Sequence, residues 1–187
     1  MRGRWISMNI GLLIAQALLI IWPPYVANAT PVLAKRVFRG RLHPIDFNKS
    51  LKDGRRILGD GKTYEGFIMG VTLGTLGGYL VVYIIGSLTA PILKYPTMLD
   101  SFIMSVAALL GDMLGAFIKR RLGLRRGEPA PLLDQLDFLL ASLLSLYLID
   151  PSLLPLPVAV TAVLITPPIH LATNAGAYLL GLKNEPW

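Results

Sequence analysis

The sequence has no cysteine, only two histidines and few charged residues. Without cysteine, the chain can form no disulfide, use no thiol nucleophile and bind no zinc through sulfur. Two histidines give little support to a histidine-ligated metal or a Cys/His nucleophile. Charged residues make up 16% and hydrophobic residues 53% of 187 residues, and the mean hydropathy is +0.57, outside the range of ordinary soluble proteins. The sequence therefore predicts a polytopic membrane protein.

Five apolar runs are close to the roughly 20 residues that a helical span needs. We predict an all-α membrane protein with five transmembrane helices in a single domain, residues 1–187; the spans are residues 6–26, 66–86, 98–118, 132–149 and 155–181. Within the last span, Pro167 and Pro168 predict a kink or break, because each lacks a backbone donor. The second span carries glycines at four-residue spacing, which predicts a face for close helix packing; they are Gly66, Gly70, Gly74 and Gly78.

Lysine and arginine are concentrated in two predicted loops. Of 18 such residues, nine lie in residues 33–65 and five in residues 119–131. Because cytoplasmic loops are enriched in these residues, we expect both long loops, after the first and third spans, to be cytoplasmic. The N-terminus is then outside and the C-terminus cytoplasmic, in the cell membrane. Residues 27–29 imitate a signal-peptidase site, but cleavage there would leave the basic segment outside.

Three aspartates lie at the predicted cytoplasmic rim of these spans. Asp112 lies inside the third apolar run, where an ionisable residue costs about 2.5–3.5 kcal/mol and is usually functional or paired. Asp134 and Asp137 lie in the first turn of the fourth span. Three carboxylates can hold Mg²⁺, which prefers oxygen ligands. The alternatives are a buried ion pair for Asp112 and an ordinary helix-dipole partner for Asp134.

Basic residues adjoin these acids. Lys119 and Arg120 directly follow the third span. They can bind phosphate, or serve as an orientation signal and lipid-surface anchor. The glycine-rich segment 53–66, DGRRILGDGKTYEG, is not a P-loop, because Arg56 stands where the motif needs its first glycine. Its backbone and side chains can still hold phosphates and close over a nucleotide, unless it is a flexible solvated loop; the candidates are Arg55, Arg56, Lys62 and Thr63.

Three polar residues at helix positions have weaker signals. Asn28, where the first span meets the cytoplasm, can join a phosphate site or simply terminate a helix. His170 and Asn174 lie at positions i and i+4. A lone histidine in a membrane helix is more often hydrogen-bonded to a neighbour than catalytic, so no role is predicted for this pair. Together, clustered acids and bases at one membrane boundary favour a membrane enzyme that handles a nucleoside triphosphate.

Several strings across nearly the whole chain resemble one family; they are YVANATPVLAK, HPIDF, DGRRILGDGKTYEG, GDMLGAFIKRRLGL, PLLDQLDF and the terminal NEPW. Together they resemble the archaeal CDP-archaeol synthases, relatives of the phosphatidate cytidylyltransferases. The wider superfamily's Lys-Arg pair and downstream Asp-x-x-Asp match Lys119, Arg120, Asp134 and Asp137. Bacterial relatives have arginine within the last motif, where this chain has Gln135.

The resemblance implies Mg²⁺-dependent transfer of the cytidylyl group from CTP to 2,3-bis-(O-geranylgeranyl)-glycerol 1-phosphate, giving CDP-archaeol and pyrophosphate. The expected partners are CTP, this diether lipid phosphate and membrane lipids, with no nucleic acid. We expect Asp112, Asp134 and Asp137 to bind Mg²⁺ and, with Lys119, to be catalytic. The expected ligands of the CTP phosphates are Asn28, Arg55, Arg56, Lys62, Thr63, Lys119 and Arg120.

Two other functions have partial support in the sequence. A CDP-alcohol phosphotransferase needs D-G-x-x-A-R, but Asp53 and Gly54 are followed at the required places by Ile57 and Leu58. A small transporter or lipid carrier would fit a proline-broken span. No inverted repeat is visible, however, and the acids lie at the rim, whereas a transport site would lie near the midplane.

Overall fold

The computed structural model describes residues 9–89, 92–183 and 185–186. The first three residues of the predicted span 6–26 lie outside the described residues, as do Asn184 and Trp187 of the terminal NEPW string. The described part is helical and contains no strand, only two isolated bridges, Pro44 with Thr63 and Ser50 with Arg56. The helices are α1 (Ile10–Ala29), α2 (Pro31–Val37), α3 (Tyr64–Thr89), α4 (Met98–Arg121), α5 (Leu133–Ile149) and α6 (Leu156–Leu179).

The predicted all-α membrane architecture is confirmed. Four segments of the described chain are long and apolar enough to cross a membrane: Ile10–Val37, Tyr64–Thr89, Met98–Arg121 and Leu156–Leu179. The fourth predicted span corresponds to α5, whose 17 residues are at the short end of the roughly 17–25 that can span a bilayer. Large apolar side chains cover the outer helix faces, as in a protein surrounded by lipid; examples are Leu80, Leu114, Leu144 and Leu164.

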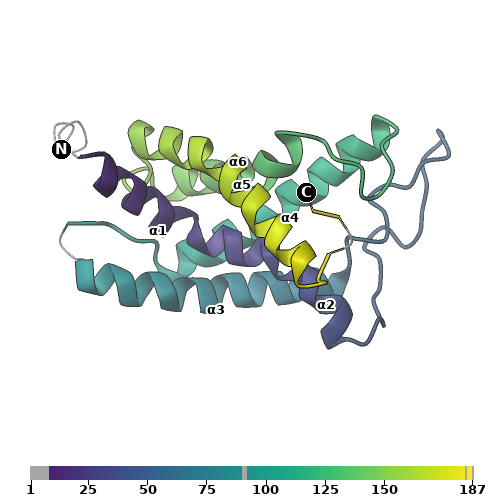
Figure 1. The fold of residues 1–187 in the computed structure, drawn as a ribbon, viewed down its shortest axis with the longest axis horizontal. Coiled ribbons are helices and arrows are strands. Elements are labelled where there is room, and N and C mark those ends of the chain that lie inside the picture. Colours follow the sequence, from purple (N-terminus) through teal and green to yellow (C-terminus); the bar gives the residue numbers. More distant parts are fainter. Residues whose placement is uncertain (1–8, 90–91, 184, 187) are drawn as a thin grey trace.

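Helix α1 is central and packs against α3, α4, α5 and α6 (Figure 1). Its closest partner face is the glycine stripe of α3, whose predicted packing role is confirmed. A Cβ added to Gly70 would lie 2.8 Å from the Ala27 carbonyl oxygen, and one added to Gly78 would lie 2.8 Å from Pro23 Cα. Larger residues at these glycines would therefore separate the two backbones.

Two local predictions need correction. Residues 33–37 belong to helix α2 and not to a loop, because Pro31 occupies a first-turn position, where proline is favourable. Helix α6 is continuous through Pro167 and Pro168, so the predicted break does not occur, and the predicted kink stays a prediction. In lipid, the polar groups that prolines free are re-satisfied by neighbours such as threonine hydroxyls. The Thr166 hydroxyl donates to the Ala162 carbonyl at 2.6 Å, on the turn before the prolines, whereas the carbonyls that lose an N–H partner are those of Val163 and Leu164.

Both long connections lie at one end of the bundle, which we call the loop end (Figure 1). It holds α2, residues 38–63 after it, residues 122–132 between α4 and α5, and the segment after α6. Asp112 and Lys119 of α4 and Asp134 and Asp137 of α5 also lie near this end, because α4 finishes and α5 starts there. The loop end therefore positions the candidate site.

Candidate active site

A cavity of about 670 Å³ opens at the loop end. Its size is within the roughly 300–1,000 Å³ of typical small-molecule sites. Eight of the ten predicted site residues line it: Asn28, Lys62, Thr63, Asp112, Lys119, Arg120, Asp134 and Asp137. They come from α1, the 38–63 loop, α4 and α5, so residues far apart in the chain converge on one space.

Asp112 projects from α4 into the cavity and forms an ion pair with Lys62 of the 38–63 loop. The loop holds Lys62 through its backbone, because the Ile45 N–H donates to the Lys62 carbonyl at 2.9 Å. The two side chains are only 26% and 23% exposed, yet both face the cavity. Asp112 therefore forms an ion pair and also lines the candidate site. Its ion-pair partner is a lysine from a loop.

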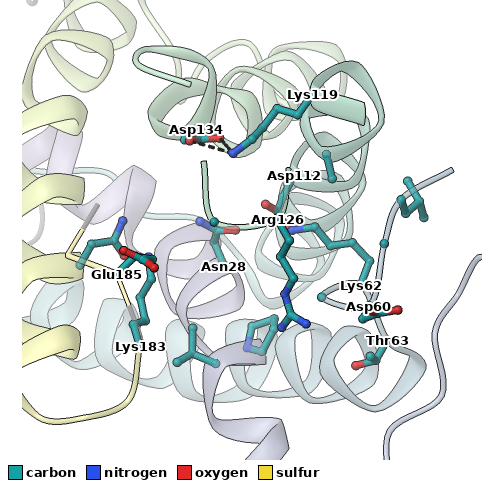
Figure 2. Close-up of a pocket in the computed structure, with 18 of the residues that line it drawn as sticks. Asn28, Asp60, Lys62, Thr63, Asp112, Lys119, Arg126, Asp134, Lys183 and Glu185 are labelled. Atoms are coloured by element: carbon teal, nitrogen blue, oxygen red, sulfur yellow. Dashed lines mark hydrogen bonds and ion pairs between the residues drawn. The ribbon is translucent and has the colours of Figure 1, made fainter. Parts of the chain in front are cut away.

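A second lysine and aspartate pair lies beside the first (Figure 2). The Lys119 ammonium donates to both carboxylate oxygens of Asp134, at 2.8 and 3.1 Å. The same carboxylate accepts from the Ala130 N–H at 2.8 Å, which fixes the start of α5. Asp134 therefore both fixes the start of its own helix and binds the Lys119 ammonium at the cavity wall.

Asp137 lies one turn deeper on α5, against the glycines of α4. A Cβ on Gly111 or Gly115 would collide with Asp137. These two glycines thus admit a carboxylate between two closely packed helices. Asp137 lines the cavity, and one of its oxygens accepts from the Phe138 N–H at 2.6 Å.

The carboxylates have the donor chemistry that Mg²⁺ prefers, oxygen without sulfur or imidazole. Within the residues that the structure describes, no three acidic, histidine or cysteine side chains are gathered closely enough to hold one ion. Mg²⁺ usually takes only one or two protein carboxylates and completes its shell with water and substrate phosphates. Aspartates that share one cavity therefore fit such an ion, and two of them, Asp112 and Asp134, have a lysine as their present partner.

Arg55 and Arg56 do not line the cavity. Arg56 binds Asp46 at 2.7 Å and Asp60 at 2.7 Å, and Arg55 donates to the Arg121 carbonyl at 2.7 Å. In the structure these two arginines hold the loop together, which makes the 38–63 segment a folded unit and not a flexible solvated loop. Their predicted contact with phosphate stays a prediction, and the side chains have protein partners.

Asp46 is the centre of that folded loop. Its side chain is 0% exposed and accepts from Arg56 and from the N–H groups of Asn48, Leu58 and Gly59. Burial alone raises the pKa of Asp46, but the Arg56 guanidinium and these N–H groups outweigh burial and hold it far below its usual range. This arrangement fixes Gly59, and with it the residues that lead to Lys62.

The cavity also contains residues that the sequence did not single out. The segment after α6 folds back over the loop end, where Arg36 of α2 donates to the Gly181 carbonyl at 2.8 Å. It places Lys183 and Glu185 across the cavity from Lys62 (Figure 2). Burial lowers the pKa of the Lys183 ammonium. The sequence predicts no site role for Lys183, because nothing in it indicates how the segment after the last span folds.

Further lining residues come from the two loops and α6. Asp60 and Arg126 flank Lys62 in Figure 2, and His170 and Asn174 of α6 also line the cavity. The i, i+4 spacing of His170 and Asn174 was a visible signal, but spacing alone does not indicate which neighbour a helix face meets. The whole lining combines acids and bases at the end of a membrane-embedded bundle, which defines the class as a membrane enzyme site for a charged, phosphate-bearing substrate.

Comparison with known proteins gives the family. The family model described as CarS-like, CDP-archaeol synthase, matches residues 10–187, and the chain belongs to that family. It is therefore an enzyme of the nucleotidyltransferase type. A CDP-archaeol synthase of Pyrobaculum calidifontis is 54% identical over 178 residues, covering 93% of this chain and 98% of the relative. One from Aeropyrum pernix is 44% identical over 174 residues, covering 93% and 92%.

A solved structure, described as an intramembrane enzyme for archaeal membrane lipids biosynthesis, is also similar. It has 39% sequence identity and a TM-score of 0.69, and the match covers 86% of this chain and 94% of that one. The likeness confirms the predicted membrane-enzyme fold. With the family assignment, it supports an enzyme over the transporter or carrier that the sequence left as an alternative.

Proposed function

We propose that the protein transfers the cytidylyl group of CTP to the phosphate of an unsaturated archaeal diether lipid, 2,3-bis-(O-geranylgeranyl)-glycerol 1-phosphate. The products are CDP-archaeol and pyrophosphate. The observation that carries the proposal is the cavity at the loop end, where Lys62 with Asp112 and Lys119 with Asp134 line one space. The names of the relatives supply the product, CDP-archaeol, and CTP is the donor that the sequence resemblance implies.

In the proposed reaction, a lipid phosphate oxygen attacks the α-phosphorus of CTP. A new P–O bond forms, the bond between the α-phosphorus and its bridging oxygen breaks, and pyrophosphate leaves with the electron pair. The attacking phosphate is already anionic, so no general base is needed. The protein must hold both substrates in line and neutralise charge on the phosphates.

Lysine and arginine supply that neutralisation. Lys62 and Lys119 already lie in the cavity. Each ammonium can exchange a carboxylate oxygen for a phosphate oxygen and stay inside the cavity. Arg120 also lines the cavity, and its Nε has no hydrogen-bond partner among the described residues. Asn28 and Thr63 add neutral polar groups to the same lining.

The carboxylates are assigned to the metal ion. Asp112, Asp134 and Asp137 would hold Mg²⁺, which would neutralise phosphate charge and polarise the α-phosphate. When these carboxylates turn away from the lysines, the ammonium groups become available to the substrate. The ion pairs thus keep both sets of groups inside the cavity before CTP arrives.

The proposed orientation puts the loop end in the cytoplasm of the cell, where CTP is available. The basic residues of segments 33–65 and 119–131 support this side, because lysine and arginine favour the cytoplasmic face. The lipid chains can then stay in the bilayer while the lipid phosphate reaches the cavity. This arrangement needs no extraction of the acceptor into water.

The test is incubation of detergent-purified protein with α-³²P-labelled CTP and the diether glycerol phosphate, with Mg²⁺ or with EDTA. We expect label in the lipid phase only with Mg²⁺, and an equal amount of unlabelled pyrophosphate. Lipid label in EDTA would contradict the Mg²⁺ requirement. No lipid label from folded protein would contradict the transfer itself, and a tracer-flux assay in vesicles would then test the carrier function.

A further inference from the structure

His170 and Asn174 are two cavity residues from the membrane-spanning helix α6 that the proposed reaction has not used. Both are half-buried on α6, and the Asn174 amide nitrogen lies 3.2 Å from His170 Nδ1 and 3.4 Å from Nε2. The imidazole also stacks on Phe138 of α5, with ring centroids 6.1 Å apart and planes 30° apart. Two neighbours therefore hold the ring at the cavity wall.

The contact with Asn174 defines what the ring offers. An amide nitrogen only donates, and it lies within hydrogen-bond distance of both ring nitrogens, so it contacts whichever nitrogen of the neutral ring accepts. A neutral imidazole that accepts at one nitrogen carries its hydrogen on the other. His170 is thereby prepared to donate one N–H to a ligand in the cavity.

The wall that carries this pair differs from the wall that carries the lysines. Helix α6 packs against α1 and α5 at the side of the bundle (Figure 1), and its other faces are apolar and exposed. Leu164 is 69% and Leu171 is 45% exposed. Lys62, Lys119 and Arg120 instead belong to the 38–63 loop and α4. Helix α6 thus separates the cavity from the lipid.

The depth of His170, counted from its helix end, matches the depth of Asp112. His170 lies nine residues before the end of α6 at Leu179, and Asp112 lies nine residues before the end of α4 at Arg121. Both are thus about 13 Å from their helix ends at 1.5 Å per residue. A lipid phosphate that enters beside α6 would meet His170 at the level of the Asp112 carboxylate.

We propose that His170 and Asn174 form the subsite for the acceptor lipid's phosphate, an inference that rests on the proposed cytidylyl transfer. The His170 N–H donates to a non-attacking oxygen of this phosphate, and Asn174 fixes the ring. Neutral donors suit an anionic nucleophile, because a tight bond to a cation would stabilise the attacking charge more strongly and lower its reactivity. Lys62 and Lys119, on the opposite wall, are left to CTP.

The experiment compares His170→Ala, His170→Gln and Asn174→Leu with the wild type. The matched control is Thr173→Val, since Thr173 is exposed on the same helix and bonds only to α6 carbonyls in the described structure. The measurements are KM for the diether lipid phosphate as mole fraction in mixed micelles, KM for CTP, and the Kd of CTP with Mg²⁺. CTP binding also reports that each variant is folded.

We expect His170→Ala to raise the lipid KM about 10- to 100-fold, the usual range for a hydrogen bond to a charged group, with the CTP Kd within about twofold. His170→Gln should recover part of the loss, because its amide also donates, and Asn174→Leu should show a smaller rise. Thr173→Val should resemble the wild type.

Three outcomes would overturn the subsite. A weaker CTP Kd with an unchanged lipid KM would assign the pair to the nucleotide. Unchanged constants in His170→Ala would make the pair structural, as would a loss of CTP binding in every His170 and Asn174 variant. A wild type without lipid labelling would instead contradict the proposed transfer, so the two failures are distinguishable.

Discussion

Two sets of acid and base pairs at the loop end differ in how completely each carboxylate is bonded. Asp46 in the 38–63 loop has no exposed side-chain surface and accepts from a guanidinium and three backbone N–H groups. Asp112 faces the cavity, 26% exposed, with one lysine as its ion-pair partner. A carboxylate with every lone pair engaged stabilises the fold, whereas one with oxygens directed at open space can exchange partners.

The largest expected effect is the loss of activity in Asp112→Asn. We expect the cytidylyl transfer rate to fall at least about 100-fold, because a charged group that acts on the reacting phosphates typically contributes this much. The thermal unfolding midpoint should stay close to the wild-type value, since the carboxylate is only partly bonded. The assay is lipid labelling from CTP beside a melting curve; full activity would remove Asp112 from the site.

The matching change in the loop, Asp46→Ala, should act on stability first. Removing one partner of a buried ion pair typically costs roughly 3–5 kcal/mol, and Arg56 and three N–H groups would lose their acceptor. We expect a lower melting temperature and faster proteolysis within residues 38–63. A variant as stable as the wild type would show that the loop is held together by other contacts.

The pH dependence of stability should separate the two pairs further. The pKa of Asp46 is lower in the folded protein than the roughly 3.9 of an unfolded chain. Its stabilisation is therefore complete above about pH 4 and is lost as pH falls further, toward the folded-state pKa. Melting curves of wild type and Asp46→Asn should differ at neutral pH and converge below about pH 4. A constant difference would contradict this assignment.

The smallest effect is expected for Arg55→Ala. Arg55 is exposed and donates to the Arg121 carbonyl outside the cavity. We expect the KM for CTP to change less than about threefold, within the small contribution of an exposed polar contact. Arg120→Met, from the cavity lining, is the matched comparison and should weaken CTP more. A large loss in Arg55→Ala alone would support direct contact of Arg55 with phosphate, as the sequence predicted.

The sequence predicted the membrane helices well because long apolar runs have few alternatives in lipid. It also predicted that Asp112, Lys119 and Asp134 share one site, because charged residues are scarce in the spans and all three lie at one boundary. The exact pairing, Lys62 with Asp112 and Lys119 with Asp134, depends on how a loop folds over the bundle. Local sequence patterns contain no such long-range geometry.

Other features lay beyond sequence reasoning for separate reasons. Pro167 and Pro168 predicted a kink or break, but the helix is continuous through both, and neighbouring polar groups can compensate the lost donors. Arg55 and Lys62 occur in one basic, glycine-rich segment with similar composition around them, yet one lies outside the cavity and the other inside. Predicting that Lys183 lines the cavity requires the path of the segment after α6, and sequence periodicity does not give that path.

The bond from Arg36 to the Gly181 carbonyl has a practical consequence for producing this enzyme. It directs the chain after α6 across the cavity opening, and Glu185 reaches the lining. An affinity tag fused after Trp187 would start three positions beyond Glu185, close to the cavity opening. Purification tags and immobilisation linkers therefore belong at the other terminus, because α1 begins at the opposite end of the bundle (Figure 1).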